Sequence, residues 1–170
     1  FFKSIKQFNS KYSSISNEVE FLYLGLVTKD LMKMANSYGI KNLLNLPGYV
    51  NHLECVKYLL ASDAVFLHIK GRKNSDAAIQ GTIGDYIGSR KYIVACIPEG
   101  VTKNTLREYG AVDFIHDNNP ESIADVYKKL YDLRRTNSIP EPDEKTVQKF
   151  DNQPYIEDLA RDFNYLLDVD

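Results

Sequence analysis

The sequence predicts an α/β protein with a Rossmann-like parallel sheet and helices on both faces. Five short apolar segments of strand length alternate with segments whose apolar residues recur at helical spacing. Such alternation is typical of a parallel sheet whose strands are joined by crossover helices. The length of 170 residues, with 44% hydrophobic and 26% charged residues, indicates a globular chain with one main domain.

The first half of the chain contains three predicted helices and two predicted strands. The helical faces are Phe1, Ile5, Phe8 and Tyr12; then Leu31, Ala35 and Tyr38, ended by Gly39; then Leu53, Val56 and Leu60. The strands are Phe21–Leu24, closed by Gly25, and Leu43–Leu46, ended by Pro47-Gly48. No capping residue precedes the first helix, so we expect the chain to begin inside a longer protein.

The second half continues the alternation. The predicted strands are Ala64–Ile69, Tyr92–Ile97 and Val112–Ile115, and the predicted helices are Gly81–Gly88 and Lys103–Tyr109. Asn119 as cap, Pro120 in the first turn and Glu121 mark a further helix, with Ile123, Val126, Leu130 and Leu133 as its buried face. We expect residues 1–136 to form the domain, and residues 137–170 to form a Pro-containing linker or arm and an amphipathic helix with Ile156, Leu159, Phe163 and Leu166.

Composition excludes several classes of function. A net charge of -2 gives no general attraction to nucleic acid. No segment approaches the roughly 20 apolar residues that a membrane-spanning helix needs, and the start resembles no signal peptide. Cys55 and Cys96 lie in apolar patterns without metal-ligand spacing, so we expect buried reduced thiols, no metal and a cytoplasmic protein.

In parallel sheets of this kind, ligands bind beyond the carboxyl ends of the strands. The stretch from Ile69 to Ile97 is the most informative, because a buried strand leads through an irregular loop into the helix at Gly81. The first turn of that helix offers unpaired N–H groups to an anion such as a diphosphate. Asp85 lies one turn on and shares a face with Thr82. It could bind a ribose diol, but the residues alone favour an ordinary solvated carboxylate.

Other polar residues near strand ends are less specific. Lys70, Arg72 and Lys73 form a basic cluster that could face phosphate, although a solvated loop explains them equally well. His52, His68 and His116 lack metal-ligand spacing and are read as structural residues. The sequence contains neither a Walker-type loop, nor a Gly-x-Gly-x-x-Gly motif, nor a Gly-x-Ser-x-Gly turn, and no catalytic base can be named.

Five collinear segments nevertheless carry a family resemblance. They are Phe21–Gly25, Leu46–His52, Ala61–Ala64, Gly81–Tyr86 and Tyr92–Gly100. In order and spacing they resemble the C-terminal, donor-binding domain of GT-B fold glycosyltransferases, most closely the bacterial group 1 (family 4) enzymes of polysaccharide biosynthesis. The resemblance covers about residues 1–133. It implies a cytoplasmic transferase that takes a sugar from a nucleoside diphosphate sugar, without a cofactor or metal, and it leaves open a peripheral association of the full-length protein with the inner membrane.

The resemblance also implies roles for individual residues. The family's Lys-x-x-Glu-Tyr signature aligns with Thr82–Tyr86, so Asp85 would bind the donor ribose. The diphosphate would lie near the N–H groups of Gln80, Gly81 and Thr82, and the base near the turn Tyr49-Val50-Asn51. Asp76 lies beside Ala77, where many relatives carry an acidic residue near the donor sugar; Lys70 and Arg72 are further candidates for the cleft.

The same resemblance implies that a preceding strand with a Gly-rich loop and an N-terminal domain are missing. Contacts with a glycan or lipid-linked acceptor would come mainly from that domain, so the fragment is not expected to act alone. Two alternatives stay open: half of a sugar-nucleotide epimerase, for which Asp76 and His116 leave room, or a non-catalytic nucleotide-sugar-binding or interaction module.

Overall fold

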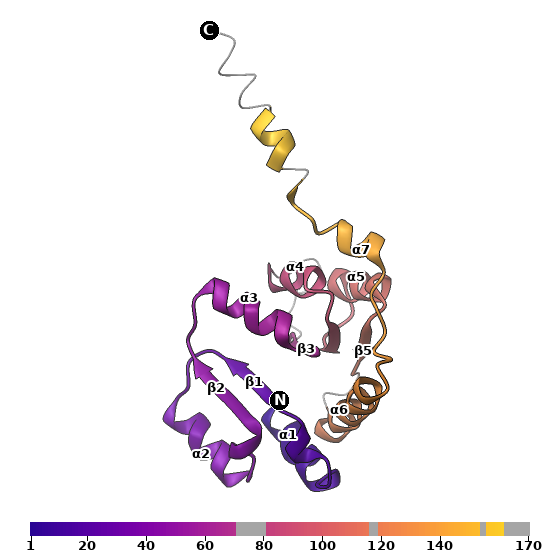
Figure 1. Cartoon of the computed structure of the whole chain (residues 1–170). Helices are drawn as coiled ribbons and strands as arrows, with labels where there is room; N and C mark the ends of the chain where they lie inside the picture. The colour runs from indigo at the N-terminus through magenta and orange to yellow at the C-terminus, as the bar shows by residue number, and fades with distance from the viewer. Residues whose placement is uncertain (71–80, 116–118, 154–155, 162–170) are drawn as a thin grey trace.

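The computed structural model describes residues 1–70, 81–115, 119–153 and 156–161. Helices and strands alternate in the order that the sequence predicts (Figure 1). The strands are β1 (Phe21–Leu24), β2 (Leu44–Gly48), β3 (Ala64–His68), β4 (Tyr92–Cys96) and β5 (Val112–Phe114). The helices are α1 (Phe2–Lys11), α2 (Lys29–Ser37), α3 (His52–Ala61), α4 (Gly81–Gly88), α5 (Val101–Tyr109), α6 (Pro120–Arg135) and α7 (Glu144–Gln148), with short 3-10 turns at Ser16–Glu18 and Lys41–Leu43.

The described strands form two sheets, and every pairing is parallel. One sheet has the order β1-β2 and the other has the order β3-β4-β5. Parallel pairing and the α/β class are therefore confirmed. Among the described residues, no hydrogen-bonded strand joins β1 to β3, so the parallel strands are divided between two sheets.

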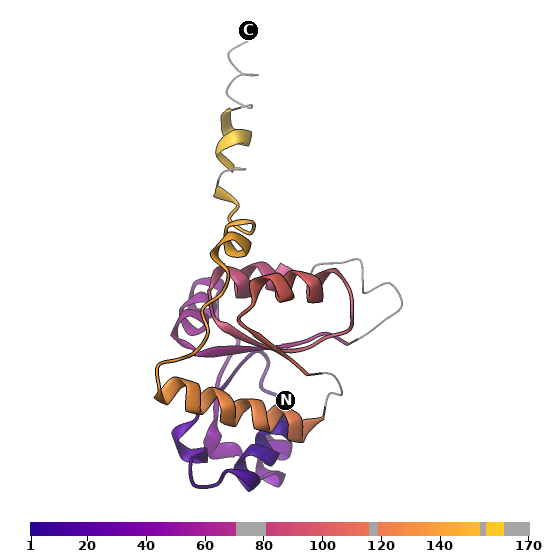
Figure 2. The same ribbon diagram turned by 90° about the vertical axis from the view of Figure 1, so that its right-hand side faces the viewer.

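Helices cover both faces of the strands (Figure 2). On one face, α1, α2 and α6 pack on a core that includes Phe21 of β1 and Val94 of β4. On the other face, α4, α5 and α7 pack on Val65, Leu67 and Ile93. One helix layer thus contacts strands of both sheets, so the two sheets belong to one folded body.

Aromatic rings dominate the core on the α1 side. Phe8 is fully buried, and its ring centroid lies 5.7 Å from that of Phe21 and 6.1 Å from that of Tyr127. The Oγ of buried Ser4 donates to the Phe1 carbonyl at 2.6 Å and lies 3.1 Å from the Tyr127 Oη. Burial raises the pKa of Tyr127, so its hydroxyl stays protonated and available for this contact.

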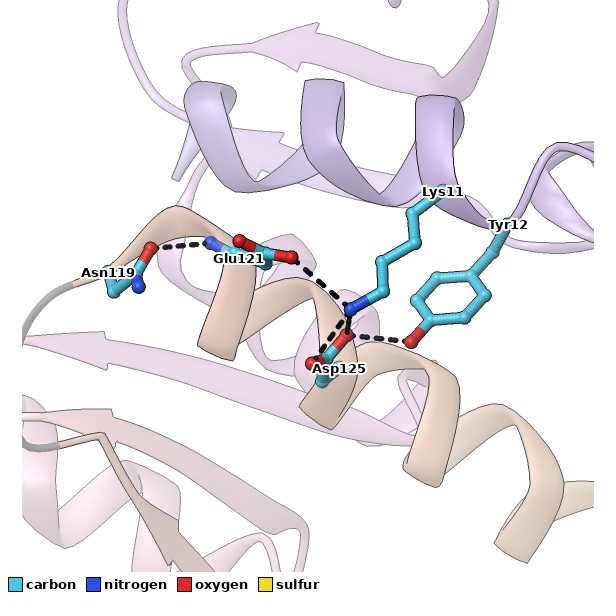
Figure 3. A network of polar contacts seen from close by, with 5 residues as sticks. All are labelled: Lys11, Tyr12, Asn119, Glu121 and Asp125. Carbon is cyan, nitrogen blue, oxygen red and sulfur yellow. Dashed lines mark hydrogen bonds and ion pairs between the residues drawn. The ribbon is translucent and has the colours of Figure 1, made fainter.

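A polar network fastens α1 to α6 at the surface (Figure 3). Lys11 Nζ lies 2.8 Å from Asp125 Oδ1, and the Tyr12 hydroxyl donates to the same carboxylate at 2.6 Å. The hydrogen bond from Lys11, and to a smaller extent that from Tyr12, lowers the pKa of Asp125. At the start of α6, Asn119 Oδ1 accepts from the Glu121 N–H at 3.0 Å, which confirms the predicted cap.

Several details differ from the sequence predictions. β2 continues through Pro47-Gly48, because it is an outer strand on which a missing N–H is tolerated. Cys55 is exposed, whereas Cys96 is buried as predicted. In α6 the buried residues are Ile123, Ala124 and Tyr127, because this side of the helix faces the aromatic core. Of the predicted face, Val126, Leu130 and Leu133 are only half-buried.

Part of the predicted linker, residues 137–148, packs on the domain and contains helix α7. The Asp143 N–H donates to the Tyr109 carbonyl at 2.9 Å, and Val147 of α7 is buried against the α4–α5 layer. Residues 156–161 are helical, and Ile156 and Leu159 are exposed. Phe163 and Leu166 of the predicted last helix lie outside the described residues.

Candidate functional site

The carboxyl ends of the strands define the edge on which a ligand site is expected. β1 ends at Leu24 and β2 continues into the turn at Tyr49, while β3 leads through His68 and Ile69 toward the start of α4. Figure 1 shows β1 between β2 and the sheet of β3, β4 and β5. From this central position the chain order runs outward to β2 on one side and from β3 to β5 on the other, so the strand order reverses between β1 and β3. Such reversal points are where open α/β sheets hold ligands.

The described part of helix α4 runs from Gly81 to Gly88, the range in which the sequence predicts a helix, and Ile83 and Ile87 are completely buried. Gly81, Thr82 and Asp85 are exposed. At about 100° per residue, Asp85 lies about 200° around the helix axis from Ile83, so its side chain points away from the sheet. The structure therefore leaves Asp85 free of overlying elements among the described residues, but on the outward face of α4.

The neighbouring face of α4 is the one that turns toward α3. Tyr86 is half-buried, and burial raises its pKa, with a smaller contribution from Cys55 of α3. Thr82 lies one turn before Tyr86 on the same side of the helix. Thr82 and Tyr86 are thus closer than Asp85 to the crossover that leads from β2 to β3.

The predicted base-binding turn follows β2. Tyr49 is 88% exposed and Val50 is half-buried. Asn51 already has a structural role, because its Oδ1 accepts from the Glu54 N–H at 3.0 Å and caps α3. The exposed Tyr49 ring is the member of this turn with a surface that a planar base could stack on.

Only part of the predicted loop can be placed. Lys70 is described and is exposed. Gln80, Asp76 and Arg72 lie outside the described residues, as do Ala77, Lys73 and His116. Of the three predicted diphosphate residues, the structure therefore brings together Gly81 and Thr82 in the first turn of α4.

An ionic cluster that was not predicted from the sequence lies at the carboxyl end of β4. The Lys103 side chain is 5% exposed, and its Nζ lies 2.6 Å from Glu99 Oε1 and 5.3 Å from the centre of the Phe114 ring. Arg107 binds the other Glu99 oxygen at 3.0 Å. Hydrogen bonds from Lys103 and Arg107 lower the pKa of Glu99. The signal in the sequence was the i, i+4 spacing of Glu99 and Lys103.

Two open hollows lie elsewhere, at the amino ends of the strands. One, of about 400 Å³, is bordered by residues 17–20 and 42–46, and the other, of about 300 Å³, includes Asp63, Arg90 and Arg134. Neither contains a predicted site residue. The carboxyl edge differs from both hollows, because helix N-termini and the reversal of strand order coincide there.

Together these features define a Rossmann-like α/β protein with a candidate anion-binding edge at α4. No protein-family model matches the chain, and no curated protein matches it either. Within the described residues, no helix is long and apolar enough to cross a membrane, and no group of three or more His, Cys, Asp or Glu side chains could hold a metal ion.

Proposed function

We propose that this chain is the donor-binding half of a glycosyltransferase that transfers a sugar from a nucleoside diphosphate sugar to a glycan or lipid-linked acceptor. The observation that carries the proposal is helix α4, the next described element after β3, whose first described residues, Gly81 and Thr82, are exposed. The collinear glycosyltransferase-like segments support the same assignment.

In this proposal, the first turn of α4 holds the diphosphate. Its N–H groups and the positive end of the helix dipole stabilise the negative charge on the leaving nucleoside diphosphate. Asp85 binds the ribose hydroxyls, and Tyr49 contacts the base. The acceptor and the remaining donor contacts come from a partner domain.

A change of charge at Thr82 tests the phosphate position. Replacing Thr82 with Lys adds a cation beside the proposed diphosphate, worth about 1 kcal/mol at contact distance in water. We expect UDP and GDP to bind at least about fivefold more tightly to Thr82→Lys, and Asp85→Ala to weaken binding of both. Heteronuclear NMR titration gives the affinity and the position of each nucleotide.

The matched control is Thr136→Lys, the same substitution at the exposed end of α6. It should leave both affinities unchanged, because Thr136 follows α6 at the opposite, amino edge of the strands. Equal gains in the two variants would mean that net charge alone attracts the nucleotides, and the proposed site would be rejected. Chemical shift changes confined to residues away from Tyr49 and α4 would reject it as well.

A further inference from the structure

The larger hollow at the amino ends of the strands has walls that the core holds in place. It measures about 400 Å³ and is bordered by residues 17–20 and 42–46. Two short 3-10 turns contribute to this border, one directly before β1 and one directly before β2. Each turn contains a buried residue, Ser16 in the first and Leu43 in the second. The hollow is therefore preformed, as small-molecule sites usually are.

Acidic and amide side chains dominate the border of this hollow. Glu18 and Glu20 each supply a carboxylate, and three amides accompany them, those of Asn17, Asn42 and Asn45. The remaining lining residues are apolar and come from the two strands or their approaches: Val19, Leu43, Leu44 and Leu46. The polar groups are thus acceptors and amides, with apolar surface between them.

The charge of the hollow selects against anions. None of the described residues that border it is a Lys or an Arg. Arg135 lies behind Glu18, where its Nη1 donates to the Tyr131 hydroxyl at 3.1 Å. Two carboxylates that face the hollow repel a phosphate or another carboxylate. A ligand that fits is therefore neutral or cationic.

Hydrogen bonds hold both carboxylates in position and leave acceptors for a ligand. Glu20 Oε1 accepts from Asn45 Nδ2 at 3.1 Å, and Glu18 Oε2 accepts from the Tyr131 hydroxyl at 2.6 Å. The second oxygen of each carboxylate accepts no hydrogen bond from another described residue, and the amides of Asn17 and Asn42 have no partner among those residues either. Positioned groups of this kind lose little side-chain entropy when a ligand binds.

This set of groups matches the hydroxyls of a sugar. A hydroxyl both donates and accepts, a carboxylate only accepts, and an amide side chain does both. Neighbouring hydroxyls can therefore donate to Glu18 and Glu20 while they accept from the amides. An ammonium group only donates, so it would leave the amide N–H groups without an acceptor. Within the described residues, no group of three or more His, Cys, Asp or Glu side chains could hold a metal ion.

We propose that this hollow binds a neutral saccharide, with Glu18 and Glu20 as acceptors and the neighbouring Asn side chains as donors and acceptors. The hollow lies at the amino edge of the strands, opposite the proposed donor site. The inference rests on the lining of the hollow alone, so it stands independently of the proposed function.

Heteronuclear NMR titration with maltotriose, cellotriose and chitotriose tests the proposal, at millimolar concentrations and without nucleotide. The side-chain amide signals of Asn17, Asn42 and Asn45 report on the site directly. We expect at least one of the three sugars to shift these signals saturably. Glu20→Gln should weaken its binding by at least about fivefold, because a charged acceptor forms stronger hydrogen bonds than a neutral one. Asn42→Ala is a second variant that should weaken it too.

The matched control is Glu141→Gln, the same substitution at an exposed residue of the other hollow. It should leave the affinity for the sugar unchanged. Equal losses in Glu20→Gln and Glu141→Gln, or no loss in either Glu20→Gln or Asn42→Ala, would overturn the proposal. The absence of a saturable shift with all three sugars would overturn it as well.

Two further outcomes would assign the sugar or the hollow differently. Shifts confined to α4 and Tyr49 would place the sugar at the proposed donor site and would reject the hollow. Shifts of the three Asn side-chain amides by calcium chloride or spermine, but not by the sugars, would make the hollow a cation site and would also reject the proposal. Nucleotide titration at α4 is a separate readout, so the failure of one proposal is distinguishable from the failure of the other.

Discussion

Removing the Phe8 side chain tests whether α1 holds the two sheets together. The ring is fully buried and contacts the rings of Tyr12, Phe21 and Tyr127 at centroid distances of 5.7, 5.7 and 6.1 Å. Loss of the buried area is worth roughly 1.5–3 kcal/mol, and the cavity and lost ring contacts bring the expected cost of Phe8→Ala to about 3–5 kcal/mol. That is a large share of the roughly 5–15 kcal/mol by which domains are stable.

The assay is urea unfolding followed by far-UV circular dichroism, combined with hydrogen exchange of peptides from each sheet. Because Phe21 of β1 and Val94 of β4 share a core with Phe8, we expect exchange to accelerate in both sheets of Phe8→Ala. The control, Leu60→Ala, removes a side chain that is 54% exposed and should cost within about 0.5 kcal/mol. A loss below about 1 kcal/mol for Phe8→Ala, or acceleration in the β1-β2 sheet alone, would refute the bridging role.

Two further substitutions test polar contacts. Tyr109 is fully buried, its hydroxyl donates to the Lys91 carbonyl at 2.8 Å, and burial raises its pKa to about 12. Tyr109→Phe should therefore cost about 0.5–1.5 kcal/mol in urea unfolding; an unchanged midpoint would contradict this contact. The second test concerns Asp125, whose pKa is lowered in the folded protein. Its ionised carboxylate stabilises the fold above the unfolded-state pKa of about 3.9, and this stabilisation is lost as the pH falls through the folded-state pKa. Asp125→Asn should flatten the loss of stability below about pH 4, by a small amount because the side chain is 47% exposed, and an unchanged pH profile would exclude the contribution.

Local signals predicted most elements well. Gly39 has a φ of +66°, the conformation that glycine favours after a helix, and it follows α2 where the sequence predicts an end. Asn119 and Pro120 mark the start of α6 for an equally local reason. These features depend on a few neighbouring residues, so the sequence carries them directly.

Features that depend on distant partners were harder to predict. Helical spacing predicts α3 but not its exposure, because burial depends on what lies across the sheet. Helix α7 lies in a Pro-containing stretch and is held by Tyr109 and the α4–α5 layer, contacts with no local signature. The lack of pairing between β1 and β3 among the described residues could not be predicted from the sequence of either strand. Each strand has an ordinary apolar pattern, and such a pattern does not specify which strand lies beside it.

The proposed donor site implies a direction from which a nucleotide reaches α4. In the proposed donor site, the nucleotide lies where the strand order reverses between β1 and β3, so it approaches α4 from the side of α3. That side of α4 carries Thr82 and Tyr86, whereas Asp85 lies about 100° further around the helix than Tyr86. In that proposal, a diphosphate at the first turn meets Thr82 before any other α4 side chain. The ribose reaches Asp85 only if the nucleotide passes over the exposed end of the helix, so the ratio of the Thr82→Lys and Asp85→Ala effects reports the path that the nucleotide takes across α4.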